Sequence, residues 1–301
     1  MDSRYSTIPL LTLGDLAPIG NFHLRVKFIV EGAIAGLHQS PYHGFSAEFL
    51  EYRPYIHGES SQRIDWRKYA KTDRTVVRLF EDETNMAAHL IIDKSASMGY
   101  GSKPPVTKFA YARTLAGALA WILVRQRDAV GMALFDDRLR LLAPPRSTSV
   151  QLKTILTRLQ QCAPAEQTFC GDALGQVARR LTKRGLCIVI SDLMDDPARI
   201  RQGLRHLRFK KQDVIVFRIL DRQELSFSRT GPIKVRDMET HAELSLDGKT
   251  ASRFFGQGIA QHQDRIAKIC RELAIDLETV STDEPFVRPL LRVLEKRRRM
   301  Y

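Results

Sequence analysis

The sequence predicts an α/β protein with a doubly wound, mostly parallel central sheet, one antiparallel edge strand and an N-terminal extension. Three observations support this fold class. From about residue 86 onward, short apolar runs alternate with long amphipathic stretches, as in βαβ units. The run at residues 187–190 is continuously apolar, which burial on both faces requires. Residues 1–85 are mixed and polar with clustered aromatics, so we expect an extension over 1–85 and the sheet domain over 86–301.

The elements follow from local patterns taken in order. Apolar runs predict strands at 87–92, 130–135, 138–142, 186–190, 214–220 and 275–280. Apolar residues at helical spacing predict helices at 108–127, 150–159, 172–181, 197–207, 257–273 and 285–298. Phe109, Ala112 and Leu115 set this spacing in the first helix, and Pro197 suits the first turn of another. The short Asp136-Asp137 turn makes 138–142 the antiparallel edge strand.

Composition indicates a soluble globular protein, because 44% of the 301 residues are hydrophobic and 27% are charged. No apolar run approaches the ~20 residues that span a bilayer. The N-terminus has an acidic second residue and no signal-peptide pattern, so we expect a cytoplasmic protein without membrane insertion. The four cysteines lack C-x-x-C spacing, which disfavours a zinc knuckle, and Cys187 and Cys270 are expected in the core.

The formal net charge of +13 leaves three kinds of acidic partner open: nucleic acid, anionic lipid or protein. The basic residues are spread along the chain. The densest run, 296–299, ends a predicted helix, where cations suit the helix dipole. No RNA-binding aromatic signature or helix-turn-helix pattern is present. A basic nucleic-acid-binding protein is therefore an alternative that the sequence disfavours.

Oxygen-bearing side chains follow the ends of two predicted strands. Asp93, Ser95 and Ser97 come after the first strand, and Asp192 comes after the strand at 186–190. Thr168 precedes the helix predicted from 172. Ligands of open α/β sheets bind beyond the carboxyl ends of the strands, so we expect these five side chains to meet there. Asp93 and Asp192 also suit a simpler alternative, as helix caps or turn residues.

Hydroxyl and carboxylate oxygens are hard ligands that suit Mg²⁺, which takes about six oxygens in octahedral geometry. Mn²⁺ or Ca²⁺ would use the same donor types. With few negative ligands, the ion keeps residual positive charge. A carboxylate from another protein would then complete its coordination shell.

This constellation resembles the metal-ion-dependent adhesion site of von Willebrand factor A domains. The D-x-S-x-S motif of that family falls on Asp93, Ser95 and Ser97, its separate threonine on Thr168 and its distant aspartate on Asp192. The resemblance implies a von Willebrand factor A or Rossmann-like fold for residues 86–301. It also implies that the serines, and often the threonine, contact the metal, whereas the aspartates act through water.

Lys94 departs from that motif. An ammonium turned toward the site would compete with the cation. The alternation of side chains along an extended loop predicts instead that Lys94 projects away from the serines.

A second resemblance lies upstream. The pattern R-x-Y-x-x-G-[DE]-x-x-x-R-I-D-W runs from Arg53 to Trp66 and is similar to the bacterial domain-of-unknown-function family 58. The two resemblances together cover about residues 40–285. They imply an adaptor or co-chaperone of a MoxR-type AAA+ ATPase, with that ATPase or a client protein donating the carboxylate. Arg53, Arg63, Asp65 and Trp66 would form either a buried packing cluster, which we favour, or a partner-binding surface.

An enzyme is the remaining alternative. Phosphatases of the haloacid dehalogenase type place a nucleophilic aspartate after the first strand, where Asp93 stands. Those enzymes need a second aspartate two residues later, and here that position is Ser95. No Walker A loop, G-x-S-x-G elbow or H-E-x-x-H motif is present. We therefore predict a binding protein, and a Mg-dependent phosphohydrolase using Asp93 is the alternative.

Overall fold

The computed structural model describes residues 11–38, 51–54, 69–70, 72, 75–79, 87–164, 169–225, 231–236 and 243–299. The strands in these ranges are β1 (Glu51–Pro54), β2 (Val76–Leu79), β3 (Ala87–Asp93), β4 (Ala129–Phe135), β5 (Leu139–Arg146), β6 (Leu186–Ser191), β7 (Asp213–Leu220), β8 (Pro232–Arg236), β9 (Glu243–Asp247) and β10 (Asp276–Ser281). The helices are α1 (Leu13–Leu16), α2 (Phe22–His38), the 3-10 helix η3 (Ala96–Gly99), α4 (Lys108–Arg125), α5 (Ser149–Gln161), α6 (Cys170–Arg180), α7 (Pro197–Phe209), α8 (Arg222–Leu225), α9 (Gly248–Glu272) and α10 (Val287–Arg299).

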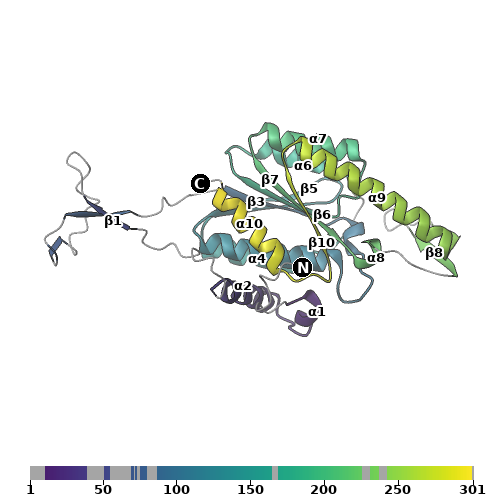
Figure 1. The fold of residues 1–301 in the computed structure, drawn as a ribbon, viewed down its shortest axis with the longest axis horizontal. Helices are drawn as coiled ribbons and strands as arrows, with labels where there is room; N and C mark the ends of the chain where they lie inside the picture. The colour runs from purple at the N-terminus through teal and green to yellow at the C-terminus, as the bar shows by residue number, and fades with distance from the viewer. Residues whose placement is uncertain are drawn as a thin grey trace.

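The central sheet has six strands in the order β10-β7-β6-β3-β4-β5 (Figure 1). The strands from β10 to β4 run parallel, and β5 pairs antiparallel with β4 at one edge. The chain adds β4 on one side of β3 and later places β6 on the other side. The strand order therefore reverses at β3, and the crevice beyond the ends of β3 and β6 is where such sheets bind ligands. The predicted fold class is confirmed.

The two faces of the sheet are covered by different helices, as a doubly wound fold requires. Leu90 and Ile92 of β3 belong to the core formed with α2, α4, α5 and α10. Ile91, which points the opposite way, belongs to the core formed with α6, α7 and α9. Figure 1 shows α4 and α10 on one side of the sheet and α6, α7 and α9 on the other.

The N-terminal helices share the first of these cores. Leu13 and Leu16 of α1 and Phe22 and Val26 of α2 are buried within it. Helix α2 approaches α4 so closely that a Cβ built on Gly117 would lie 2.9 Å from Val26 Cγ2. Residues 13–33 thus pack with the sheet domain, and the division into 1–85 and 86–301 stays a prediction.

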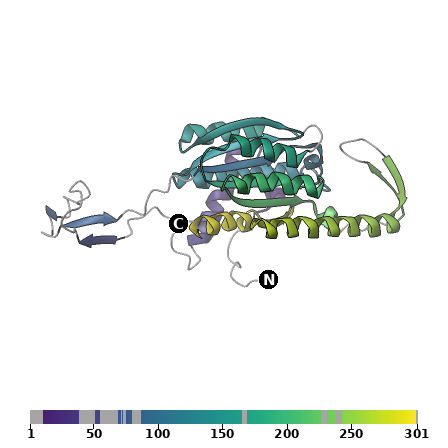
Figure 2. The same cartoon turned by 90° about the horizontal axis from the view of Figure 1, so that it is seen from above.

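The predicted strands and helices are all present from residue 87 onward, with small shifts at their ends. The structure adds elements that the pattern did not indicate. These are α1, α2, η3, α8, the antiparallel pair β1–β2 and the antiparallel pair β8–β9. Helix α9 begins at Gly248, earlier than predicted, and Figure 2 shows it extending beyond the sheet toward that hairpin. Cys187 and Cys270 are buried and free, as expected.

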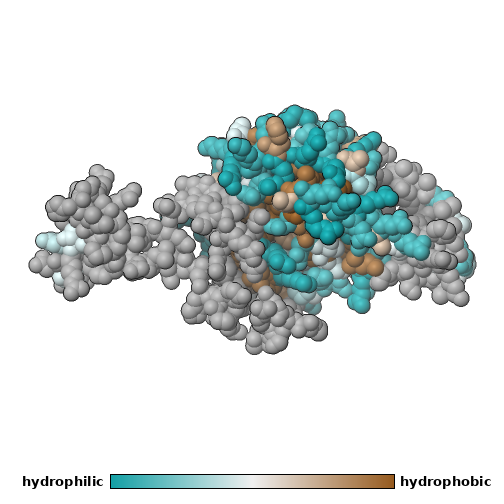
Figure 3. Space-filling view, turned by 45° about the horizontal axis from the view of Figure 1, so that its top comes forward, coloured by the Kyte–Doolittle hydropathy of each residue, from teal (hydrophilic) through white to brown (hydrophobic). Residues whose placement is uncertain are grey.

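The helices that cover the sheet present polar side chains to solvent. Figure 3 shows a face on which hydrophilic residues cover most of the coloured surface. Within the described residues, no helix combines the length and the apolar character needed to cross a membrane.

The family-signature residues Arg63, Asp65 and Trp66 lie outside the described residues.

Candidate metal centre

A buried carboxylate stands at the carboxyl end of each of four adjacent strands. Asp93 ends β3, and Asp136, Asp192 and Asp221 directly follow β4, β6 and β7. Each of these residues is at most 2% exposed. Because parallel strands end at the same edge of the sheet, the four acids form a row across the switch point of the strand order. Such a row needs cations or hydrogen-bond donors close by.

Asp93 is held by neutral donors. Its Oδ1 accepts a hydrogen bond from the Ser95 backbone N–H at 2.9 Å, and its Oδ2 accepts one from the Ser191 hydroxyl at 2.6 Å. Burial raises the pKa of Asp93 to about 7, and the nearby charge of Asp192 adds to this effect. The two hydrogen bonds fix the orientation of the Asp93 carboxylate. A cation nearby would offset the repulsion between Asp93 and Asp192.

The two serines lie side by side at the start of η3, where Ser95 is the N-cap residue. Ser95 Oγ and Ser97 Oγ are 3.1 Å apart. Neighbouring ligands of an octahedral Mg²⁺ with oxygen distances of about 2.1 Å lie about 3 Å apart. The spacing of the hydroxyls therefore suits two adjacent ligands of one ion. Ser95 is fully buried and Ser97 is half-buried, so a cation on this pair would be reachable from the side of Ser97.

Asp192 carries one neutral and one charged contact. Its Oδ1 accepts a hydrogen bond from the Met194 backbone N–H at 3.2 Å. Its Oδ2 lies 2.7 Å from the ammonium of Lys108. The fifth predicted residue, Thr168, lies outside the described residues. The structure thus brings Asp93, the serine pair and Asp192 to one edge of the sheet.

Lys108 is the residue of this site that the sequence pattern did not indicate. It opens helix α4, whose N-cap is Thr107, and its side chain is 1% exposed. Its ammonium lies 2.7 Å from both Asp192 Oδ2 and Glu224 Oε1. Burial alone would lower the pKa of Lys108, but the attraction of the two carboxylates outweighs it and raises that pKa. A lysine in the first turn is unfavourable with respect to the helix dipole, and the two carboxylates compensate for this.

Lys94 points away from the serine pair, as the alternation predicted. Its ammonium lies 2.8 Å from Asp136 Oδ2, beyond the end of β4. Arg140 completes the surroundings of Asp136, with Nε 2.6 Å from Oδ1. The lysine of the motif therefore neutralises Asp136.

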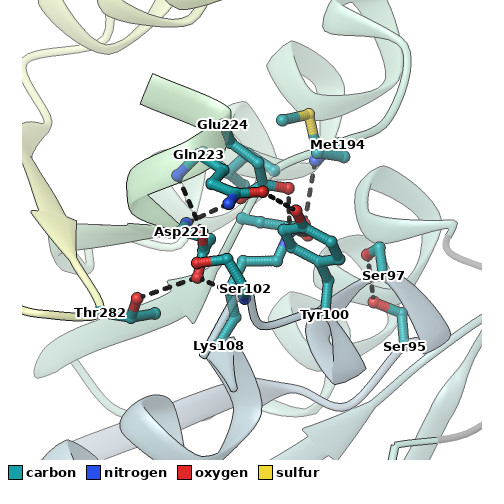
Figure 4. Close-up of polar contacts among 12 residues, drawn as sticks. Ser95, Ser97, Tyr100, Ser102, Lys108, Met194, Asp221, Gln223, Glu224 and Thr282 are labelled. Atoms are coloured by element: carbon teal, nitrogen blue, oxygen red, sulfur yellow. Dashed lines mark hydrogen bonds and ion pairs between the residues drawn. The ribbon is translucent and has the colours of Figure 1, made fainter. Parts of the chain in front are cut away.

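A polar cluster ties the serine loop to α8 (Figure 4). The Tyr100 hydroxyl donates to Gln223 Oε1 at 3.3 Å, and the Ser102 backbone N–H donates to Asp221 Oδ2 at 3.0 Å. Glu224, which contacts Lys108 through one oxygen, accepts a hydrogen bond from the Asp221 backbone N–H through the other. The segment after β3 and the segment after β7 are thus fastened together around the ammonium of Lys108.

The donor set decides which metals suit the site. Among the described residues, no group of three or more His, Cys, Asp and Glu side chains is arranged to hold a metal. The set found here instead combines two hydroxyls with two carboxylates, which are hard oxygen donors. It fits Mg²⁺ in donor type and in the spacing of the serine oxygens.

Comparisons with known proteins bear on family and fold. Residues 51–265 match the family described as "Protein of unknown function DUF58". An uncharacterized protein of Mycobacterium tuberculosis is 24% identical over 302 residues, which cover 97% of this chain and 94% of the relative. An uncharacterized protein of Mycobacterium bovis matches to the same extent.

Solved structures with a similar fold include an aerotolerance-related membrane protein from Bacteroides fragilis. It has a TM-score of 0.50 and 17% identity, and the match covers 70% of this chain and 99% of that one. The von Willebrand factor A domain of SpRpn10 is also similar, with a TM-score of 0.43, 12% identity and coverage of 69% and 94%. The likeness concerns the fold alone. The family match spans more than half of this chain, so the chain belongs to the DUF58 family, and its central sheet is mostly parallel with one antiparallel edge strand.

Proposed function

We propose that this protein is a metal-dependent protein-interaction module. In this proposal Ser95 and Ser97 bind Mg²⁺ directly, and Asp93 and Asp192 orient the water that completes its coordination. Thr168 supplies a further oxygen. Mn²⁺ or Ca²⁺ would serve in place of Mg²⁺. A MoxR-type AAA+ ATPase, or a client protein handled with it, donates a carboxylate to the open position of the ion.

The observation that carries the proposal is the 3.1 Å separation of the two serine hydroxyls at the edge where two buried acids meet. Hydroxyl ligands add no negative charge, so a divalent ion held mainly by them keeps most of its own charge. Such an ion favours an anionic ligand from outside. The half-buried position of Ser97 supports access from solvent.

The phosphohydrolase alternative draws no support from the surroundings of Asp93. Its side chain is fully buried, and both carboxylate oxygens accept hydrogen bonds. A nucleophile needs an oxygen free to attack phosphorus, and a general acid nearby. These contacts favour a role in orienting the loop.

The test is capture of a purified MoxR-type ATPase from the same genome by the immobilised chain. We expect capture in Mg²⁺ and its loss in EDTA. Ser95→Ala with Ser97→Ala, and Asp93→Ala with Ser95→Ala, should abolish the Mg²⁺-dependent part, because each double substitution removes ligands or their support.

Ser147→Ala with Ser149→Ala is the matched control. These serines have the same spacing and are exposed. They follow Arg146, which pairs with Val130 near the start of β4. The control serines therefore lie at the ends of the strands opposite to those that carry Asp93 and Asp192. The control should bind as the unmodified chain does. Equal capture with and without EDTA, unchanged by the Ser95 and Ser97 substitutions, would refute the proposal.

A further inference from the structure

The ammonium of Lys108 is a buried positive charge in contact with an acid of the candidate site. It is 2.7 Å from Asp192 Oδ2 and 2.7 Å from Glu224 Oε1. The exposed fractions of the Lys108 and Asp192 side chains are 1% and 0%. An ion pair so removed from water is weakly screened, and it therefore acts strongly on any further charge nearby.

Lys108 and a divalent cation make opposing demands on Asp192. One carboxylate oxygen is already in contact with the ammonium, and the other accepts a backbone hydrogen bond. A metal ion drawing on this carboxylate, directly or through water, shares it with a fixed positive charge. The two cations also repel each other across a poorly screened interior.

Glu224 moderates this competition. It takes up part of the charge of the ammonium, and it is fixed in place because its Oε2 accepts a hydrogen bond from the Asp221 backbone N–H at 2.8 Å. Asp221 in turn accepts hydrogen bonds from the Ser102 and Gln223 backbone N–H groups. Arg218 of β7, 2% exposed, adds a second buried positive charge on the strand next to β6. The ammonium of Lys108 thus pairs with two acids at once, Asp192 of the candidate site and Glu224 of α8.

We infer that Lys108 is a built-in competitor that sets the affinity of the site for divalent cations. Glu224 weakens this competition by drawing the ammonium away from Asp192. Lys108 is a positioning residue here, since its side chain contacts the acid and not the partner. The inference rests on the proposed function, because it assigns a control to the same metal site. Because of Lys108, the chain binds cations with lower affinity than the oxygen ligands of the site alone would give.

The test is Mn²⁺ binding followed by electron paramagnetic resonance of the free ion. Lys108→Met, which keeps much of the side-chain volume, should tighten binding at least tenfold. Glu224→Gln should weaken binding several-fold, because the ammonium then rests on Asp192 alone. In the Lys108→Met background, Glu224→Gln should have little effect. A purely structural role for the cluster would lower affinity in both single variants.

Thermal unfolding of each variant shows whether it folds. The doubly substituted chain avoids leaving the half-buried Glu224 carboxylate without its cationic partner. Weaker or unchanged Mn²⁺ binding in folded Lys108→Met would overturn the inference. If Ser95→Ala with Ser97→Ala abolishes binding while the Lys108 and Glu224 variants behave as the unmodified chain, the inference alone fails. Binding seen only after Lys108→Met would support it. Absence of binding in every variant would overturn both the inference and the proposed function.

Discussion

The four buried aspartates at the carboxyl ends of the strands are stabilised by different partners. Asp136 faces the cations of Lys94 and Arg140, whereas Asp93 is held by neutral donors. A buried acid that has cationic partners is stabilised by them. An acid held only by neutral donors beside another acid benefits from an added cation. By this criterion, the proposed cation would act mainly on Asp93 of β3, whereas Asp136 after β4 already has its ion pairs.

Asp136 gives a prediction on pH dependence. Burial alone would raise its pKa, but hydrogen bonds with Asp137, Lys94 and Arg140 hold that pKa at about 2. Since the folded pKa lies below the unfolded value of about 3.9, its stabilisation is present above pH 4 and is lost as pH falls toward 2. Asp136→Asn should lower the free energy of unfolding by about 1–2 kcal/mol at pH 7, allowing for partial solvent screening.

Urea unfolding at pH 7 and at pH 3 measures this effect, with Asp264→Asn, an exposed change on α9, as the control. The loss caused by Asp136→Asn should be smaller at pH 3. A loss of equal size at both values would show that the ion pairs of Asp136 contribute nothing to stability.

Most of the candidate site could be read from the sequence because its residues follow strand ends. Asp93, Ser95, Ser97 and Asp192 come just after apolar runs, and a parallel sheet collects such positions at one edge. Lys108 could not be assigned in this way. Its partner Asp192 is 84 residues away in the sequence. Helical periodicity indicates that a helix begins at position 108, but it does not indicate what the Lys108 side chain contacts. Pairings between distant segments depend on how the helix docks, which local patterns do not contain.

At the scale of elements, helices α6 and α7 approach each other closely where they cross. A Cβ built on Gly203 would lie 2.5 Å from the carbonyl oxygen of Gly171. Backbone atoms cannot withdraw from such a contact without moving the helix. The two glycines are therefore required by packing between these helices.

Gly203→Ala should lower the free energy of unfolding by about 1–3 kcal/mol, because it overpacks this crossing. Gly256→Ala is the matched control, since a Cβ there would meet nothing within 4 Å. In exposed helix that change should be neutral or stabilising by up to about 1 kcal/mol. Chemical denaturation of both variants tests the pair, and equal effects would argue against the close crossing.

Elements with clear apolar periodicity were predictable, and elements that depend on tertiary contacts were not. The strand β6 is apolar from residue 186 to residue 190, as expected for a strand whose two faces are both covered. Helix α2 carries the β-branched residues Val26, Ile29 and Val30 on its buried side. Such residues are weak helix formers, so the helix relies on packing against α4. The spacing of these buried residues is nevertheless helical, so a signal for α2 was present although its residue types are weak helix formers.

At the scale of the whole molecule, α2 belongs to the cooperative core. Phe22→Ala should lower the free energy of unfolding of the sheet domain by about 3–5 kcal/mol, because Phe22 is buried in that core. Leu24→Ala, on the exposed side of the same helix, should change it by less than about 0.5 kcal/mol. Far-UV circular dichroism during urea unfolding measures both. An unchanged midpoint in Phe22→Ala would mean that residues 86–301 fold independently of α2.

The fold places the serine pair beyond the end of β3, at the switch point of the sheet, and Ser97 is half-buried. Whether the serines bind a cation at all is the central question, and direct titration with Mn²⁺ answers it without any partner. We expect saturable binding by the unmodified chain and by Ser147→Ala with Ser149→Ala, and a loss of at least tenfold in affinity for Ser95→Ala with Ser97→Ala. Equal Mn²⁺ affinity in all three chains would contradict the account.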